Sequence, residues 1–113
     1  MDSEYEMLLD VANACRYMVR NDVHNPERLK ISFDNGFHWK LWNPFKKDDD
    51  CFRVCIDLGI RVLEEGAVVK SRLIATSDFD WMDTFCETSE KINKYQAART
   101  CVMILATRIA RKK

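Results

Sequence analysis

The sequence predicts a single α+β domain, in which two hairpins form a four-stranded antiparallel sheet and three helices pack against it. Apolar residues recur at helical spacing in three segments, and they alternate with polar residues in the two segments between these helices. A chain of 113 residues suits one compact domain, residues 1–113, without room for a second core. A hydrophobic content of 47% with only three Gly and two Pro excludes a disordered or fibrous polypeptide.

The first predicted helix begins near residue 3 and runs to about Arg20. Ser3 followed by Glu6 fits a capping box, in which each side chain accepts from a backbone N–H of the first turn. Apolar side chains then recur at helical spacing: Leu8, Val11, Ala12, Cys15, Met18 and Val19. The turn-forming stretch around Pro26 ends this helix.

A hairpin is predicted in the segment LKISFDNGFHWKLW, residues 29–42. Apolar residues alternate with polar ones on both sides of its centre: Ile31 and Phe33 before it, and Phe37, Trp39 and Leu41 after it. The central Asn35-Gly36 pair readily takes the positive backbone angles of a tight turn. The sequence therefore predicts two antiparallel strands that share one apolar face.

A second helix is predicted after Asn43-Pro44, because proline has no amide hydrogen to donate to a strand ladder. The three aspartates at 48–50 are typical of a helix start, where acidic side chains cap free amides and complement the helix dipole. The apolar face of this helix carries Cys51, Val54, Cys55 and Leu58. Gly59 stands where a left-handed residue commonly ends a helix.

The remaining chain predicts a second hairpin and a long helix. Residues 60–74 suit a hairpin with its turn near Glu65-Gly66, and residues 77–90 suit a loop or a short helix. A helix from about Ser89 to Arg111 follows, with a core stripe of Tyr95, Ala98, Val102, Leu105 and Ile109. The pattern leaves open whether the helices cover one face of the sheet or both.

The sequence shows no motif for catalysis or metal binding. Successive helical residues point about 100° apart, so the aspartates at 48–50 are expected to cap a helix rather than converge on a metal ion. Cys51 and Cys55 share a helix face, but no other Cys or His stands at a recognisable ligand spacing, which favours core thiols over zinc. We therefore expect no enzyme activity, no metal and no cofactor.

Cysteine usage and hydropathy indicate a cytoplasmic protein. The five cysteines include no C-x-x-C pair, and the acidic N-terminus does not fit a secretory signal, so reduced thiols are expected. The longest apolar run, CVMILA at 101–106, is far shorter than the roughly 20 residues needed to span a bilayer, so no membrane is expected among the partners. The 18 acidic and 18 basic residues disfavour a globally basic nucleic-acid binder.

Two charged segments are candidate binding surfaces. The candidate partner-binding residues of the first, acidic and aromatic, are Asp78, Phe79, Asp80, Trp81 and Asp83. Aromatic side chains ringed by charge are typical of protein interfaces, although buried aromatics beside solvated acids give the same pattern. The alternative is a nucleic-acid surface on the basic end of the last helix: Arg99, Arg108, Arg111, Lys112 and Lys113. The helix dipole alone also favours bases there, and the CVMILA run must contact another layer or another chain, which leaves a homo-oligomer open.

Two further stretches carry a resemblance. The first consists of Trp42-Asn43-Pro44, the acidic Asp48 and Asp49, and a short apolar helix ending in Leu58-Gly59-Ile60; the second is the Ala/Arg-rich segment at 96–112. Through these two stretches, the C-terminal two thirds of the chain resembles small phage and prophage proteins of the phage ABA-sandwich domain type. The chain departs from that family pattern at Cys51 and Cys55, where small apolar residues are usual. The resemblance implies an α/β/α sandwich, with helices on both faces of an antiparallel sheet, and no catalytic residue. It also implies a phage-type accessory protein in the cytoplasm of a bacterial host cell. We expect such a protein to bind a host protein without catalysis, as an inhibitor of a host defence system.

Overall fold

The computed structural model describes residues 3–26, 28–66, 71–77, 83–87 and 94–112. The helices and strands in this part of the chain are α1 (Glu4–Ala14), β1 (Met18–Asn21), β2 (Leu29–Ser32), β3 (Lys40–Trp42), α2 (Asp48–Leu58), β4 (Ile60–Gly66), β5 (Ser71–Ser77), β6 (Asp83–Glu87) and α3 (Lys94–Lys112). The strands form two three-stranded antiparallel sheets, with the orders β1-β2-β3 and β4-β5-β6.

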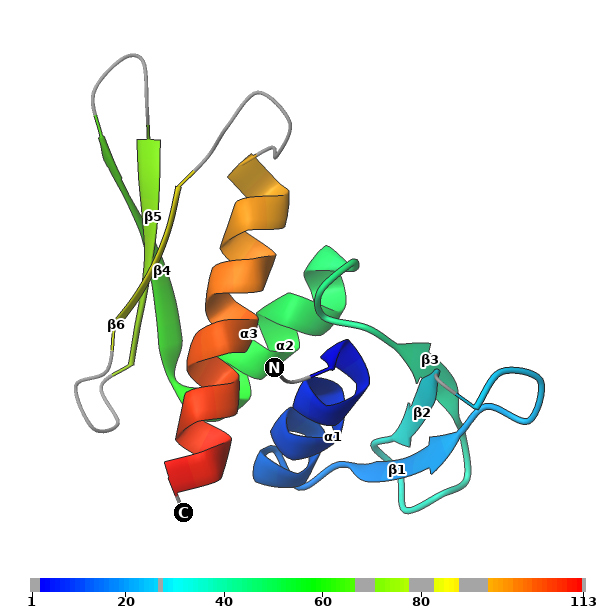
Figure 1. Ribbon diagram of the computed structural model, residues 1–113. Coiled ribbons are helices and arrows are strands. Elements are labelled where there is room, and N and C mark those ends of the chain that lie inside the picture. The colour runs from blue at the N-terminus through cyan, green and yellow to red at the C-terminus, as the bar shows by residue number, and fades with distance from the viewer. Residues whose placement is uncertain (1–2, 27, 67–70, 78–82, 88–93, 113) are drawn as a thin grey trace.

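The helices lie between the two sheets (Figure 1). α3 packs against the β4-β5-β6 sheet and also against α1 and α2, while α1 contacts β1. One continuous core joins these layers, and it includes Leu8 and Val11 of α1, Ile31 of β2, Val54 of α2 and Met103 of α3. The apolar run at 101–106 therefore contacts other layers of the same chain, which is one of the two environments predicted for it.

The predicted α+β class and three helices are confirmed, but the sheet arrangement differs from the predicted four-stranded sheet in an α/β/α sandwich. Each predicted hairpin has a third strand, because β1 joins the first and β6 joins the second. The two sheets lie on opposite sides of the helices, so the helices cover one face of each sheet (Figure 1).

α1 begins where the sequence predicts and ends earlier. The Ser3 hydroxyl accepts the Glu6 N–H at 3.1 Å, as a capping residue should. The helix ends at Ala14 instead of about Arg20, because Arg16 takes a left-handed conformation with φ of 63°. Its N–H and the next one donate back to carbonyls of the last helical turn at 3.1 and 3.0 Å, as in a Schellman motif. The chain reverses there, and residues predicted to end the helix form β1 instead.

The first hairpin has a wider turn than predicted. Asn35 and Gly36 do take positive φ angles, of 60° and 92°. However, the Ser32 hydroxyl accepts the Gly36 N–H at 2.8 Å, and the connection between β2 and β3 extends over residues 33–39. Phe33 and Phe37 lie in this loop with 43% and 84% of their surface exposed, so the prediction that they line an apolar strand face is wrong.

The C-terminal elements differ from the prediction mainly at their boundaries. The predicted turn near Glu65-Gly66 lies inside β4, since Gly66 still pairs with Ser71. The predicted loop or short helix at 77–90 contains the strand β6. The predicted core stripe of α3 is buried at Val102, Leu105 and Ile109. Tyr95 of the same stripe is 68% exposed, because it lies in the first turn of the helix.

Candidate functional site

The predicted acidic partner-binding segment falls mainly outside the described residues. The part that is not described contains Asp78, Phe79, Asp80 and Trp81. Asp83 is the first residue of β6, and its backbone pairs in register with Thr76 of β5. The hypothesis that this segment binds a partner therefore stays a prediction.

Two residues of the predicted basic surface hold the fold together. The Arg99 guanidinium donates to the Phe45 carbonyl at 2.9 Å and to the Asp48 carboxylate at 2.6 Å. The Arg111 guanidinium donates to the Asp10 carboxylate at 2.8 Å. These bonds tie α3 to the start of α2 and to α1, so both arginines already have acidic partners within the chain.

The other predicted bases do not form one surface with Arg99. Arg108 and Lys112 are exposed near the end of α3, and Lys113 lies outside the described residues. Helix geometry places Arg99 and Arg108 on opposite sides of α3, about 14 Å apart along its axis. The predicted nucleic-acid surface is thus divided in the structure.

The aspartates at the start of α2 have different surroundings. Asp48 and Asp49 are exposed, whereas Asp50 is 2% exposed. The Asp50 carboxylate accepts the Asn43 N–H at 3.0 Å and the Lys40 ammonium at 3.2 Å. Asp50 therefore fixes the end of β3 and the following turn to α2. The prediction that the aspartates cap α2 is wrong, because the N-cap residue is Lys47, without a side-chain capping bond, and the aspartates form the first helical turn.

The thiols of α2 pack inside the fold. Cys51 is buried and Cys55 is half-buried, and both are free. A hydrogen bond to the Cys55 sulfur, together with burial, raises the pKa of the Cys51 thiol above its ordinary range. Among the residues that the structure describes, no group of three or more His, Cys, Asp or Glu side chains is placed to hold a metal ion.

The turn after β3 is held by the backbone and side chain of Asn43. Its side-chain oxygen accepts the Phe45 N–H at 3.0 Å, and its carbonyl accepts the N–H groups of Lys46 and Lys47 at 3.1 and 2.9 Å. Pro44, the next residue, is buried. The Trp-Asn-Pro element thus orders a turn that presents two lysine side chains in succession, and both are exposed.

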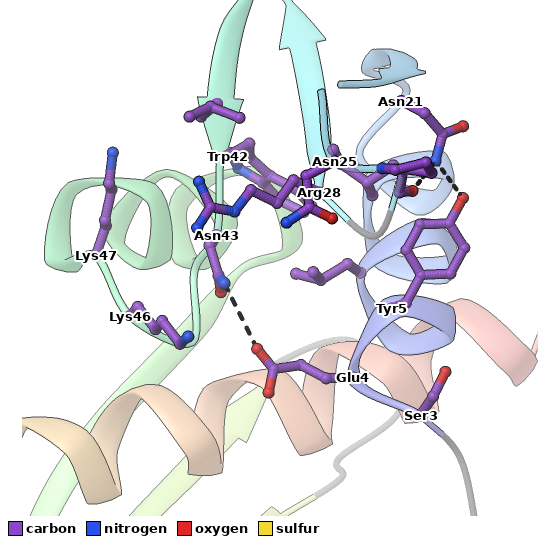
Figure 2. A pocket seen from close by; sticks show the side chains of 14 residues that line it. Ser3, Glu4, Tyr5, Asn21, Asn25, Arg28, Trp42, Asn43, Lys46 and Lys47 are labelled. Carbon is purple, nitrogen blue, oxygen red and sulfur yellow. Dashed lines mark hydrogen bonds between the residues drawn. The ribbon is translucent and has the colours of Figure 1, made fainter. Parts of the chain in front are cut away.

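This turn forms one side of a pocket of about 1080 Å³ (Figure 2). The other sides are the first turns of α1 and the connection between β1 and β2. The lining residues are Ser3, Glu4, Tyr5, Leu8, Asn21, Asn25, Pro26, Arg28, Leu29, Leu41, Trp42, Asn43, Lys46 and Lys47. Among the described residues, no carboxylate forms an ion pair with Arg28, Lys46 or Lys47. Among the described lining residues there are thus three bases and one acid, Glu4.

Polar contacts shape the walls of this pocket. The Asn21 amide donates to the Tyr5 hydroxyl at 2.7 Å and to the Pro26 carbonyl at 2.5 Å, which joins α1 to the β1–β2 connection. Across the pocket, the Asn43 amide donates to the Glu4 carboxylate at 3.5 Å (Figure 2). These contacts order the amide groups that face the pocket.

Trp42 contributes an unusual polar group to this wall. Its side chain is 2% exposed, and its buried indole N–H has no hydrogen-bond acceptor among the described residues. A buried N–H without an acceptor costs about 1–3 kcal/mol. The N–H group itself is buried, and the Tyr17 ring packs edge-on against the indole with 5.8 Å between ring centroids.

A second surface feature lies on α2. Phe52 and Ile56 are 67% and 66% exposed, although both are large apolar side chains. They are four residues apart on a helix and so lie side by side. The Arg53 guanidinium sits 3.9 Å above the centre of the Phe33 ring, next to Ile56 on the helix surface. We call Phe33, Phe52, Arg53 and Ile56 the α2 face.

Contacts made by Tyr17 hold the α2 face in place. The Tyr17 ring meets the Phe33 ring edge-on, with 5.0 Å between centroids, and the Tyr17 hydroxyl donates to Asp57 of α2. Burial and this hydrogen bond raise the pKa of Tyr17 above its ordinary value of 10.0. The contacts of Arg53 with Phe33 and of Asp57 with Tyr17 therefore join α2 to the segment around β1 and β2.

Sequence reasoning did not find either surface. The adjacent Lys46 and Lys47 were a visible signal for the pocket, but Arg28 and Glu4 reach it only through the tertiary fold. The exposure of Phe52 follows from which side of α2 is covered by α3, and no local signal in the sequence predicts it.

Comparisons with protein-family models, with curated proteins and with solved structures find no match for this chain. Within the described residues, no helix is long and apolar enough to cross a membrane. The functional proposals below therefore depend on the geometry of the two surfaces and on the sequence.

Proposed function

We propose that this protein is a small accessory protein that acts by binding a bacterial host protein through the α2 face, without catalysis. The observation that carries the proposal is the exposure of Phe52 and Ile56, at 67% and 66%, side by side on one helix. Adjacent large apolar side chains in water are an unfavourable surface unless a partner covers them.

The composition of the α2 face supports a protein partner. Aromatic residues and arginine are enriched among the residues that dominate binding energy at protein interfaces. Arg53 is already stacked on Phe33, and Phe33 is held by Tyr17, so part of this surface is ordered before a partner arrives. Pre-ordered side chains lose less conformational entropy on binding.

The choice of a host protein rests on the resemblance to small phage proteins. An inhibitor of a host defence system needs a complementary surface and no chemistry of its own. The α2 face is a surface of this kind. The nucleic-acid alternative has less support, because Arg99 and Arg111 are paired with Asp48 and Asp10.

The test compares capture of host proteins by the unmodified chain and by the double variant Phe52→Ser with Ile56→Ser. Val23 supplies the matched control, because it is apolar and 87% exposed but lies in the β1–β2 connection. We expect the same host protein to be captured by the unmodified chain and by Val23→Ser, and to be lost with the double variant. With the purified partner, the dissociation constant should rise about tenfold or more in the double variant.

Two further experiments test where the interface lies and whether the partner is a host protein or a second copy of the chain. Reversal of Asp78, Asp80 and Asp83 to Lys tests the acidic segment in the same assay; loss of capture in that variant alone would move the interface away from the α2 face. Sedimentation of the unmodified chain tests self-association. A dimer that the double variant abolishes would make a second copy, and not a host protein, the occupant of the α2 face.

A further inference from the structure

We propose that the pocket between the first turns of α1, the β1–β2 connection and the Trp42–Lys47 turn binds a nucleoside phosphate. This site is separate from the α2 face, and the inference does not depend on the proposed function. It follows from the charge of the pocket and from the mixture of side chains that line it.

The charge of the pocket favours an anion. Arg28 and the adjacent Lys46 and Lys47 reach it from two different parts of the chain, and Glu4 is the single acid among the lining residues. Arginine presents several N–H groups in a planar fork that matches phosphate oxygens, and lysine adds a compact positive charge. Since these bases make no ion pair with a described carboxylate, they are available to a ligand.

The first turn of α1 adds to this attraction. The pocket is lined by Ser3, Glu4 and Tyr5, at the end of the helix where backbone N–H groups and the helix dipole give a partial positive charge. Glu4 offsets part of that charge. Its carboxylate lies 3.5 Å from the Asn43 amide, on the wall opposite α1.

The rest of the lining fits an uncharged, ring-shaped body. Leu41 and Pro26 are exposed and Tyr5 is half-buried, so they supply apolar surface above an almost fully buried floor of Leu8, Leu29 and Trp42. The amides of Asn21, Asn25 and Asn43, which also have partners within the chain, add polar groups. A nucleobase has apolar faces and an edge of alternating donors and acceptors, so it suits this combination. A volume of about 1080 Å³ is ample for a ligand of this size. Inorganic phosphate alone would leave the apolar part of the pocket unused.

Trp42 provides a local probe of binding. It lines the pocket, although its side chain is 2% exposed and its indole N–H is buried. A ligand at this wall changes the surroundings of the indole. Binding should therefore be visible at the Trp42 indole itself, and not only in a change of heat or stability.

The experiment is calorimetric titration of the full chain with the four ribonucleoside monophosphates and triphosphates, the matching nucleosides, and inorganic pyrophosphate. The test variant is Lys46→Gln with Lys47→Gln, which removes two exposed bases without breaking a described side-chain contact. Arg108→Gln with Lys112→Gln is the matched control, because it removes two exposed bases from the far end of α3. Arg28→Gln is a second test variant from another side of the pocket, and circular dichroism confirms that each variant is folded.

We expect at least one nucleotide to bind with a dissociation constant below about 1 mM and its nucleoside to bind at least about tenfold more weakly. The lysine double variant and Arg28→Gln should each weaken the nucleotide about tenfold or more, and the control should leave it unchanged. The indole N–H resonance of Trp42 should shift on nucleotide addition. Absence of binding by every nucleotide at about 5 mM, or equal binding by both double variants, would overturn the proposal. Pyrophosphate binding as tightly as any nucleotide would overturn its nucleoside part.

Discussion

Asp50→Ala is expected to be among the most destabilising single substitutions of a charged residue in this chain. The carboxylate is 2% exposed and accepts from the Asn43 N–H and the Lys40 ammonium. A hydrogen bond to a charged acceptor contributes about 1.5–3 kcal/mol, and the loss leaves a partly buried N–H without an acceptor. The lysine side chain is 49% exposed and can return to water, so its ion pair adds less than about 1 kcal/mol. We therefore expect the free energy of unfolding to fall by about 2–4 kcal/mol.

Urea unfolding followed by circular dichroism measures this loss. With a denaturant dependence of roughly 1.5 kcal/mol per molar urea, the midpoint should fall by roughly 1–3 M. Asp49→Ala is the matched control, because this neighbouring aspartate is exposed in the same helical turn and contributes below about 1 kcal/mol through the helix dipole. Asp50→Asn keeps one acceptor and should lie between the two. Equal midpoints for Asp50→Ala and Asp49→Ala would refute the reasoning from burial.

Three other experiments test separate features of the structure. Gly59→Ala should cost about 1 kcal/mol in a urea titration, from backbone strain alone, because Gly59 has a φ of +67° and a Cβ there meets nothing within 4 Å; no loss would mean that the left-handed conformation is not required. The raised pKa of Tyr17 means that the folded state keeps a proton that the unfolded chain releases above the ordinary value of 10.0, so stability should fall as the pH rises beyond it, by up to about 1.4 kcal/mol per pH unit. Urea titrations on both sides of that pH should show this slope removed by Tyr17→Phe and kept by Tyr5→Phe. Mild alkylation of the native protein, mapped by mass spectrometry, should modify Cys55 before Cys51, and the reverse order would contradict the burial of Cys51.

Local signals in the sequence predicted the features that depend on few residues. Ser3 caps α1, Asn35-Gly36 takes the predicted positive angles, and Gly59 ends α2 with φ of 67° and ψ of 39°. Each of these depends on the conformational preference of one or two residues, so no knowledge of the rest of the fold was needed.

The early end of α1 could not be predicted in this way. Arg16 has a positive φ although it is not Gly, Asn or Asp, and nothing in its neighbourhood signals this. Met18 and Val19 continue the helical spacing, but they also suit a strand, and pairing of β1 with β2 decides between the two. Tertiary pairing thus overrides a periodicity that is correct up to Ala14.

The candidate sites were still less accessible from sequence. The pocket brings Glu4, Arg28 and Lys46 together from three parts of the chain, and no spacing between them identifies the group. The exposure of Phe52 depends on how α2 turns against α3. Such surfaces result from packing between distant segments, whereas a helix cap or a turn depends on the local residues alone.

The position of α3 has a consequence for the order in which the chain acquires its structure. α3 follows the other described elements in the chain, yet it lies between the β4-β5-β6 sheet and the other helices (Figure 1). The bond from Arg111 to Asp10 joins residues 101 positions apart, and contacts of such separation slow folding because a long loop must close first. A nascent chain that has not yet reached α3 leaves apolar sides of α1, α2 and the β4-β5-β6 sheet without cover, and surface of this kind recruits chaperones or aggregates. Synthesis of α3 is therefore expected to be the step that covers these surfaces, and chains truncated before residue 94 should accumulate as insoluble or chaperone-bound species.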